Sequence, residues 1–273
     1  MTKIAYLGPE GTYSEHAAKL WNHESQLIPS DSINMVSKTV ENGLADQGII
    51  PIENSIEGGV TFTLDLMIHE SELLICGEIV IPINHFLMAK EKIELSEIKA
   101  VYSHPQSLGQ CREFLKKHLP NAELLASLSN STAVKEMLES NYSAAAISSQ
   151  RAANLYDAFI LKENIEDRLN NETRFIVISR KDHEKTGDDK TSLCFEFDGD
   201  RPGTLGFSLM EFASRNINLV KIESRPNKKD LGRYVFFVEI EGHRFDQNIM
   251  QAIDALSMNV SMLKILGSYP KHK

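Results

Sequence analysis

Over the first 180 residues, short apolar segments of strand character alternate with segments of helical period. The strand candidates are, in chain order, KIAYLG, QGIIPI, LLICGEIVIPINHFLMA, IKAVYS, AELLAS, SAAAIS, AFILKE and RFIVIS. Between them lie segments such as EHAAKLW and the series Ile33, Val36, Val40, Leu44, whose apolar residues recur every three to four positions. Repeated strand–helix alternation predicts an α/β fold with largely parallel strands, in which ligands bind beyond the carboxyl ends of the strands.

The pattern changes after residues 181–190, KDHEKTGDDK, which contain no apolar side chain and are the best linker candidate. The remaining residues predict strand (TSLCFEF), helix (204–216), strand (NLVKIES), strand (RYVFFVEIEG), helix (247–257) and strand (SMLKILGS). This βαββαβ order is ferredoxin-like. The sequence therefore predicts a large α/β part, residues 1–180, and a small α+β module, residues 191–273.

Length, charge and cysteine content narrow the class of protein. A chain of 273 residues suggests roughly two domains. The net charge of −9 argues against nucleic acid as a partner and requires any anion site to be locally positive. No apolar run approaches the ~20 residues that span a bilayer, so no membrane partner is expected, and MTKIAYLGPE is predicted to be a strand, not a signal peptide. Cys76, Cys111 and Cys194 lack disulfide or ligand spacing, which predicts a reduced, cytoplasmic protein.

Four polar clusters fall where predicted strands end. They are GPEGTYSEHAA (8–18), PIENSIEGGV (51–60), YSHPQSLGQC (102–111) and NNETRFIVIS (170–179). Hydroxyls, amides and backbone N–H groups with one arginine suit a small oxygen-rich anion. The sequence has no GxGxxG after a strand, no P-loop, no zinc-like spacing and no GxSxG, so it predicts no cofactor and no metal.

Two of these clusters match the spacing of a helix capping box, Thr12 with Glu15 and Ser103 with Gln106. Pro105 fits the first turn of the second helix, where its missing N–H does no harm. A well-made cap or turn without a ligand explains each cluster taken alone. Four such clusters at strand ends of one α/β unit favour a pocket.

In the fourth cluster, Arg174 precedes an apolar run, Phe175 to Ile178, that is typical of a buried strand. A charge taken out of water is costly unless it is paired. Arg174 therefore meets either a carboxylate of the protein or one that comes from outside.

The motifs GPEGTYS, PIENSIEG, SHPQSLGQC, NETRF and NLVKIESRP, in this order, resemble those of prephenate dehydratase with a C-terminal ACT domain. The resemblance covers essentially the whole chain. It implies decarboxylating dehydration of prephenate to phenylpyruvate, water and CO2 in phenylalanine biosynthesis. It also implies a catalytic part with two lobes like a periplasmic binding protein, roughly 1–77 plus 159–180 and 78–158, then an ACT domain that binds L-phenylalanine as feedback inhibitor, in a homodimer or homotetramer.

The resemblance also assigns roles to individual residues. Thr173 is expected to interact with the departing hydroxyl, and Arg174 with a substrate carboxylate, preferably as a bidentate pair. Arg174 would then meet a carboxylate from outside. Further substrate contacts are expected from Phe175, Thr12, Ser14, Asn54, Ser55, Ser103, His104, Gln106 and Gln110.

In the C-terminal module, the resemblance places the phenylalanine site at the loops PGTLG (202–206) and ESRP (223–226). The residues expected there are Gly203, Thr204, Leu205, Glu223, Ser224, Arg225 and Pro226. Family members commonly have Gly-Ala-Leu where this chain has Gly-Thr-Leu; a threonine there still fits a helix cap, and its hydroxyl puts effector affinity in question. Our hypothesis is that phenylalanine shifts the balance between open and closed clefts. Two alternatives stay open: an arogenate dehydratase, and a non-catalytic sensor of an aromatic metabolite.

Overall fold

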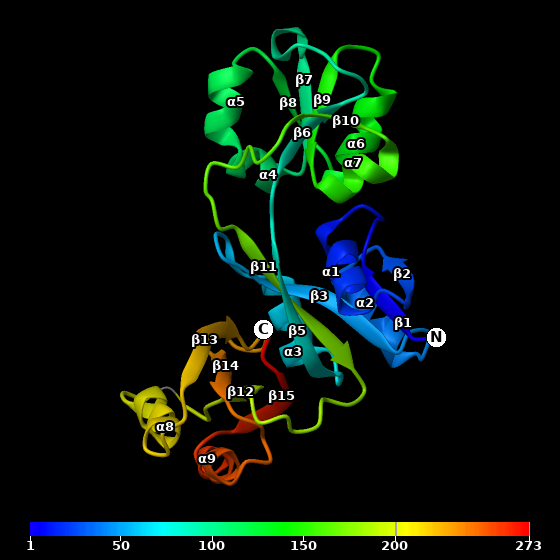
Figure 1. The fold of residues 1–273 in the computed structure, drawn as a ribbon. Helices are drawn as coiled ribbons and strands as arrows, with labels where there is room; N and C mark the ends of the chain where they lie inside the picture. The colour runs from blue at the N-terminus through cyan, green and yellow to red at the C-terminus, as the bar shows by residue number, and fades with distance from the viewer. Residues whose placement is uncertain (200, 273) are drawn as a thin grey trace. The chain divides into compact units, whose positions relative to one another are not determined.

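The computed structural model describes residues 1–199 and 201–272 (Figure 1). The chain forms two compact units and passes between them several times. Unit 1 comprises Met1–Ser32, Glu53–Gly58 and Val80–Thr173, and unit 2 comprises Ile33–Ile52, Gly59–Ile79 and Arg174–Lys273.

Unit 1 begins with a parallel strand pair. β1 (Lys3–Leu7) pairs with β2 (Gln26–Ser30), and α1 (Tyr13–Trp21) connects them. A parallel pair needs such a crossover, because the second strand must start at the same end as the first. The middle residues of β1, Ile4 to Tyr6, are almost fully buried.

The rest of unit 1 is built on a five-stranded sheet of order β10-β6-β9-β7-β8. The strands are β6 (Phe86–Ala89), β7 (Ala100–Ser103), β8 (Glu123–Ala126), β9 (Ala144–Ser148) and β10 (Phe159–Lys162). The helices are η1 (Leu95–Glu97), α4 (Pro105–Gln110), α5 (Arg112–His118), α6 (Asn130–Glu139) and α7 (Gln150–Tyr156). Successive residues of β6 pack into different hydrophobic cores: Leu87 belongs to one core and Met88 to the other. This alternation shows that both faces of the sheet are covered.

Unit 2 contains most of three neighbouring strands and a separate C-terminal module. The neighbouring strands are β3 (Gln47–Asn54), β11 (Glu172–Ser179) and β5 (Leu74–Pro82), with β4 (Gly58–Gly59), α2 (Ile33–Glu41) and α3 (Thr61–His69) beside them in sequence. The module consists of β12 (Asp189–Glu196), α8 (Thr204–Ala213), β13 (Leu219–Pro226), β14 (Tyr234–Glu241), α9 (Gln247–Ser257) and β15 (Met262–Pro270).

The C-terminal module has the βαββαβ order that the sequence predicts. Its antiparallel sheet has the order β13-β14-β12-β15. One core joins the sheet to both helices; its members include Phe195, Phe212, Val238 and Leu256. The first strand starts at Asp189, two residues inside the predicted linker.

One predicted strand is divided in the structure, and the helices can be compared with the expectation of no membrane span. The apolar run at residues 73–89 forms two strands, β5 and β6, and residues 83–85 lie between them. The Ile83 N–H donates to the carbonyl of Asn171 at 2.8 Å. Pro82, which lacks an N–H, precedes the break. Among the described residues, none of the helices is both long enough and apolar enough to cross a membrane.

Candidate active site

Thr173, the predicted catalytic residue, is half-buried near the start of β11 and is held by Asn54 at the end of β3. Asn54 Nδ2 donates to Thr173 Oγ1 at 2.9 Å. Asn54 Oδ1 accepts from the backbone N–H groups of Ile56 (3.0 Å) and Glu57 (3.1 Å), so the turn after β3 fixes the amide orientation. The Thr173 proton meets no acceptor within the described part of the chain. Thr173 Oγ1 therefore accepts from the protein and keeps its proton for another partner.

Ser55, another predicted site residue, anchors the segment that leads into Thr173. Its backbone N–H donates to the carbonyl of Glu172 at 2.9 Å, and its Oγ accepts from the Glu172 N–H at 2.9 Å. The Ser55 hydroxyl also donates to the carbonyl of Asn170 at 3.3 Å. These bonds hold Ser55, in the turn after β3, against residues 170 and 172, which precede Thr173.

At the third cluster, Pro105 occupies the first turn of α4 as predicted, but the capping box of Ser103 and Gln106 is wrong. Ser103 is still part of β7, fully buried, and its hydroxyl donates to the carbonyl of Ile147 at 2.8 Å. His104 is the N-cap instead, and its Nδ1 accepts from the Gln106 N–H at 3.3 Å. Ser103 thus supports the start of α4 and has no proton left for a substrate carboxylate.

Asn130, which sequence reasoning missed, connects this cluster to α6. Its Oδ1 accepts from the Ser107 hydroxyl (2.9 Å) and from the His104 N–H (3.3 Å), and it lies 3.1 Å from the Ser103 hydroxyl, whose proton is donated to Ile147. The available signal was the polar run SNST at residues 129–132, which opens a helix.

At the first cluster, Thr12 caps α1, accepting from the Glu15 N–H at 3.3 Å as predicted. The return bond differs from a capping box, because Glu15 accepts from Gly11 N–H at 2.7 Å. Gly11 has φ +86°, and a Cβ there would lie 2.6 Å from Ser131 Oγ, so glycine is required. Ser14 is buried in the first turn of the helix.

Gln110 reaches the neighbourhood of Thr173 through a second residue that sequence reasoning missed. Gln110 Oε1 accepts from Asn171 Nδ2 at 3.0 Å, and Asn171 Oδ1 accepts from Asn54 Nδ2 at 2.8 Å. His85 Nε2 also contacts Gln110 Oε1, at 2.9 Å. The predicted residues Asn54, Gln110 and Thr173 therefore belong to one hydrogen-bonded group.

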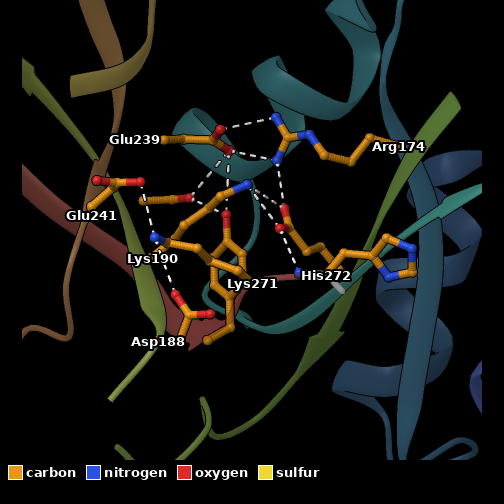
Figure 2. A network of polar contacts seen from close by, with 10 residues as sticks. Arg174, Asp188, Lys190, Glu239, Glu241, Lys271 and His272 are labelled. Atoms are coloured by element: carbon orange, nitrogen blue, oxygen red, sulfur yellow. Dashed lines mark hydrogen bonds and ion pairs between the residues drawn. The ribbon is translucent and has the colours of Figure 1, made fainter. Parts of the chain in front are cut away.

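Arg174 is paired inside the protein, so the prediction of an external carboxylate is wrong. Its Nη1 contacts Glu78 Oε2 at 3.1 Å. Its Nη1 and Nη2 contact Glu239 Oε1 (3.0 Å) and Oε2 (2.9 Å), and Figure 2 shows Arg174 facing Glu239. The three side chains are 11%, 2% and 1% exposed. Successive side chains of a strand point to opposite faces, so Arg174 turns away from the face of Thr173. Phe175, also predicted to contact substrate, is buried.

The carboxylates around Arg174 form a charged cluster with the C-terminal module (Figure 2). Lys190 Nζ lies 2.8 Å from Glu78 Oε1, and the His272 N–H donates to the same oxygen at 3.0 Å. Burial alone would raise the pKa of Glu78, but the bonds and charge of Lys190 outweigh it and lower the pKa. Glu78 is therefore held ionised.

The chain is similar to known proteins over most of its length. Residues 4–183 match the family model described as prephenate dehydratase. The chain belongs to the prephenate dehydratase family. It is 44% identical to the bifunctional chorismate mutase/prephenate dehydratase of Aquifex aeolicus, over 98% of this chain and 74% of that protein. It is 41% identical to the prephenate dehydratase of Methanocaldococcus jannaschii, over 98% of this chain and 97% of that protein.

A solved structure agrees with the fold over nearly the whole chain. The prephenate dehydratase of Arthrobacter aurescens in complex with L-Phe superimposes with a TM-score of 0.91 at 36% identity, covering 99% of this chain and 90% of that one. The predicted α/β fold class, with a ferredoxin-like C-terminal part, is confirmed. The family model itself ends at residue 183, before the module.

In this prephenate dehydratase family member, the first predicted effector loop borders a cavity of about 410 Å³ in the module. Gly203, Thr204 and Leu205 line it, together with Phe197, Gly199, Arg201, Pro202, Gly206, Gly232, Arg233, Tyr234 and Phe236. Gly203, and not Thr204, is the N-cap of α8, and its φ of +87° suits glycine. The Thr204 hydroxyl donates to the carbonyl of Arg201 at 2.9 Å.

The second effector loop, ESRP, closes β13 as predicted, but its residues are absent from the lining of that cavity. Arg225 Nε contacts Asp65 Oδ1 at 3.1 Å, and the Pro226 carbonyl lies 3.2 Å from His69 Nε2. Within the described chain, the structure therefore brings Gly203–Leu205 to the cavity and leaves Glu223–Pro226 outside it.

Proposed function

We propose that this chain converts prephenate into phenylpyruvate, water and CO2, and that the Thr173 hydroxyl assists by donating a hydrogen bond to the departing hydroxyl. The observation that carries the assignment of Thr173 is the 2.9 Å bond from Asn54 Nδ2. That bond occupies a lone pair of Thr173 Oγ1 and leaves the proton for a ligand.

The chemistry requires modest help from the protein. The ring C–O bond breaks and the hydroxyl leaves as water after taking one proton. The ring carboxylate leaves as CO2, and its bonding electrons complete the aromatic ring. A threonine hydroxyl is a weak acid, so a positioned hydrogen bond suffices in this proposal, with the proton drawn finally from solvent. General acid assistance of this kind contributes about 10²–10⁴-fold, and positioning supplies the rest.

Binding of the two substrate carboxylates falls to uncharged donors in this proposal, because Arg174 is paired inside the protein. Gln106 is exposed and His104 half-exposed at the start of α4. Burial lowers the pKa of His104, which favours a neutral imidazole with one N–H to donate.

We further propose that the module is an ACT domain that binds L-phenylalanine at the loops 202–206 and 223–226. The cavity at Gly203 and the L-Phe complex of the Arthrobacter aurescens relative support this assignment. Since Glu223–Pro226 lie outside that cavity, a site using both loops takes them from two copies of the chain, in a homodimer or homotetramer. The reduced state expected of the three buried cysteines fits a cytoplasmic enzyme.

The deciding experiment measures phenylpyruvate formation from prephenate by the purified protein, with and without L-phenylalanine, and beside it turnover of arogenate. Product from prephenate that falls with phenylalanine supports both proposals. Faster turnover of arogenate indicates an arogenate dehydratase. Folded protein that binds prephenate without forming product indicates a sensor.

The role of Thr173 is tested by a matched pair of variants. Thr173→Val keeps the side-chain shape and loses the proton, so kcat should fall by about 10²-fold or more with little change in KM. Thr173→Ser keeps the hydroxyl and should retain kcat within about tenfold. Steady-state kinetics on both variants checks this, and comparable kcat for Thr173→Val and wild type would exclude the assigned role.

A further inference from the structure

A chain of side-chain hydrogen bonds leads from Thr173 to a buried histidine. Thr173 Oγ1 accepts from Asn54, whose Nδ2 also donates to Asn171 Oδ1 at 2.8 Å. Asn171 Nδ2 donates to Gln110 Oε1 at 3.0 Å, and His85 Nε2 lies 2.9 Å from the same oxygen. All five residues belong to unit 1.

The direction of every bond in this chain is determined. Two backbone N–H groups hold Asn54 Oδ1, so its Nδ2 must face Asn171 Oδ1 (2.8 Å) and Thr173 Oγ1 (2.9 Å), with the Glu172 carbonyl farther away at 3.1 Å. Asn171 must then present its oxygen to Asn54 and its Nδ2 to Gln110, because the reverse would set two donors against each other. Gln110 Oε1 already accepts from Asn171, so His85 donates from Nε2. Gln110 Nε2 is turned to Glu57 Oε1, at 3.3 Å.

Most members of this hydrogen-bonded group are buried, although burying polar side chains is unfavourable. Asn54, Asn171 and His85 are 7%, 3% and 1% exposed. His85 Nδ1 is buried and meets no hydrogen-bond donor among the residues described. Burial lowers the pKa of His85, which keeps the imidazole neutral, with its one proton on Nε2. A buried polar group left unsatisfied is unfavourable, and its retention suggests that the orientation of its other nitrogen is used.

We propose that Asn171 and His85 are positioning residues for the Thr173 hydroxyl. Together with Gln110 they fix the Asn54 amide, so that Thr173 Oγ1 accepts from Asn54 and its proton is directed at the departing hydroxyl. Neither residue contacts the reacting atoms in this arrangement. The inference rests on the proposed dehydratase function and adds two residues that the predicted site lacked.

Asn171→Asp tests the direction of the hydrogen bonds between Thr173 and His85. The substitution keeps the shape and still accepts from Asn54, but an ionised carboxylate cannot donate to Gln110 Oε1. At pH 8 we expect kcat to fall about 10- to 100-fold, the range known for residues that orient the ligands of metal sites. As the pH is lowered to about 5, the buried carboxyl takes up a proton, donates to Gln110 and restores kcat. Asn171→Leu, the matched control, should stay low at every pH.

The readout separates positioning from other effects. Repulsion between the new carboxylate and an anionic substrate would appear in KM, and a loosened fold would lower kcat equally at all pH values. A kcat for Asn171→Asp that is flat with pH relative to wild type, or within twofold of wild type at pH 8, overturns the inference. No turnover of prephenate by the wild type overturns the proposed function, and the inference falls with it.

His85 provides a second test if the Asn171 variants do not fold. His85→Gln retains an N–H that can donate to Gln110, and its kcat should stay within about threefold of wild type. His85→Leu removes the donor and should lower kcat by about tenfold or more without raising KM. Equal kcat for the two variants, with both folded by circular dichroism, contradicts a positioning role for His85.

Discussion

At the scale of single residues, Glu15 is the carboxylate whose ionisation contributes most clearly to stability. Its side chain is 4% exposed and contacts Arg151 Nη2 at 3.0 Å, Lys19 Nζ at 2.8 Å and the Gly11 N–H at 2.7 Å. Burial alone would raise the pKa of Glu15, but the hydrogen bonds from Arg151, Lys19 and Gly11 outweigh it and lower the pKa to about 2.

The sign of the resulting pH dependence is set by linkage. The pKa of Glu15 is lower in the folded than in the unfolded protein, so its stabilisation is complete above about pH 4.5 and is lost as the pH falls towards 2. We expect Glu15→Gln to cost about 2 kcal/mol at pH 7, since water screens the half-exposed Lys19 and Arg151, and distinctly less at pH 3. Urea unfolding at both pH values measures this, with the exposed Glu24→Gln as control. An equal cost at pH 3 and pH 7 would contradict the assignment.

Residue types and local turns could be predicted from the sequence, while partners distant in sequence could not. Thr12 capping α1 and Pro105 in the first turn of α4 depend only on neighbours, and both were found. Arg174 was misassigned because its partners, Glu78 and Glu239, lie 96 and 65 residues away. Thr173 and Arg174 are successive residues of one strand, so the period of two places their side chains on opposite faces.

At the scale of elements, β11 carries the proposed catalytic residue on one face and an ionic cluster on the other. Among the four most buried charged side chains of the cluster, Arg174 and Lys190 provide two positive charges, and Glu78 and Glu239 provide two negative ones, so these four are balanced. Glu239 also lies 3.3 Å from the Tyr269 hydroxyl, whose pKa burial raises, which keeps the phenol protonated. The cluster joins β5 and β11 to β12, β14 and β15 of the module.

Removing one charge from this cluster should cost more than removing two of opposite sign. Glu239→Gln leaves a buried net positive charge, and we expect a loss of about 3–5 kcal/mol in the free energy of unfolding. The double variant Glu239→Gln/Lys190→Met restores the balance and should recover part of that loss. Urea unfolding of wild type, both single variants and the double variant gives the coupling energy. A double variant whose cost is the sum of the two single costs would show that the charges are not coupled.

Elements near the site also show where patterns are insufficient. The run at residues 73–89 contains a local signal for its break, Pro82 followed by Asn84 and His85, but the Asn171 carbonyl that accepts from the Ile83 N–H lies far away in the sequence. The βαββαβ order of the module needed no such long-range information, because each of its strands and helices has its own period and turn. Asn171, beside the Thr-Arg-Phe motif, was visible as an amide, but its partner Gln110 lies 61 residues away.

At the scale of the whole molecule, the proposed inhibition by phenylalanine depends on how the module's first loop is built. Gly203 has φ +87°, and a Cβ there would lie 3.0 Å from the Phe207 ring. Alanine at such a position costs roughly 1–2 kcal/mol, enough to shift the loop that lines the cavity. The Thr204 hydroxyl, by contrast, donates to the carbonyl of Arg201. The departure from Gly-Ala-Leu therefore adds no unsatisfied hydroxyl proton to the cavity.

Two substitutions therefore separate the loop's backbone from its unusual side chain. We expect Gly203→Ala to raise the half-inhibiting phenylalanine concentration about tenfold, the equivalent of about 1.4 kcal/mol, while turnover without phenylalanine stays unchanged. Thr204→Ala should alter that concentration by less than about threefold. Inhibition curves of prephenate turnover measure both, because the coupling of effector and substrate sites is a ratio of affinities. If Thr204→Ala moves the curve as far as Gly203→Ala, the threonine hydroxyl contacts the effector and its bond to Arg201 does not persist in the inhibited state.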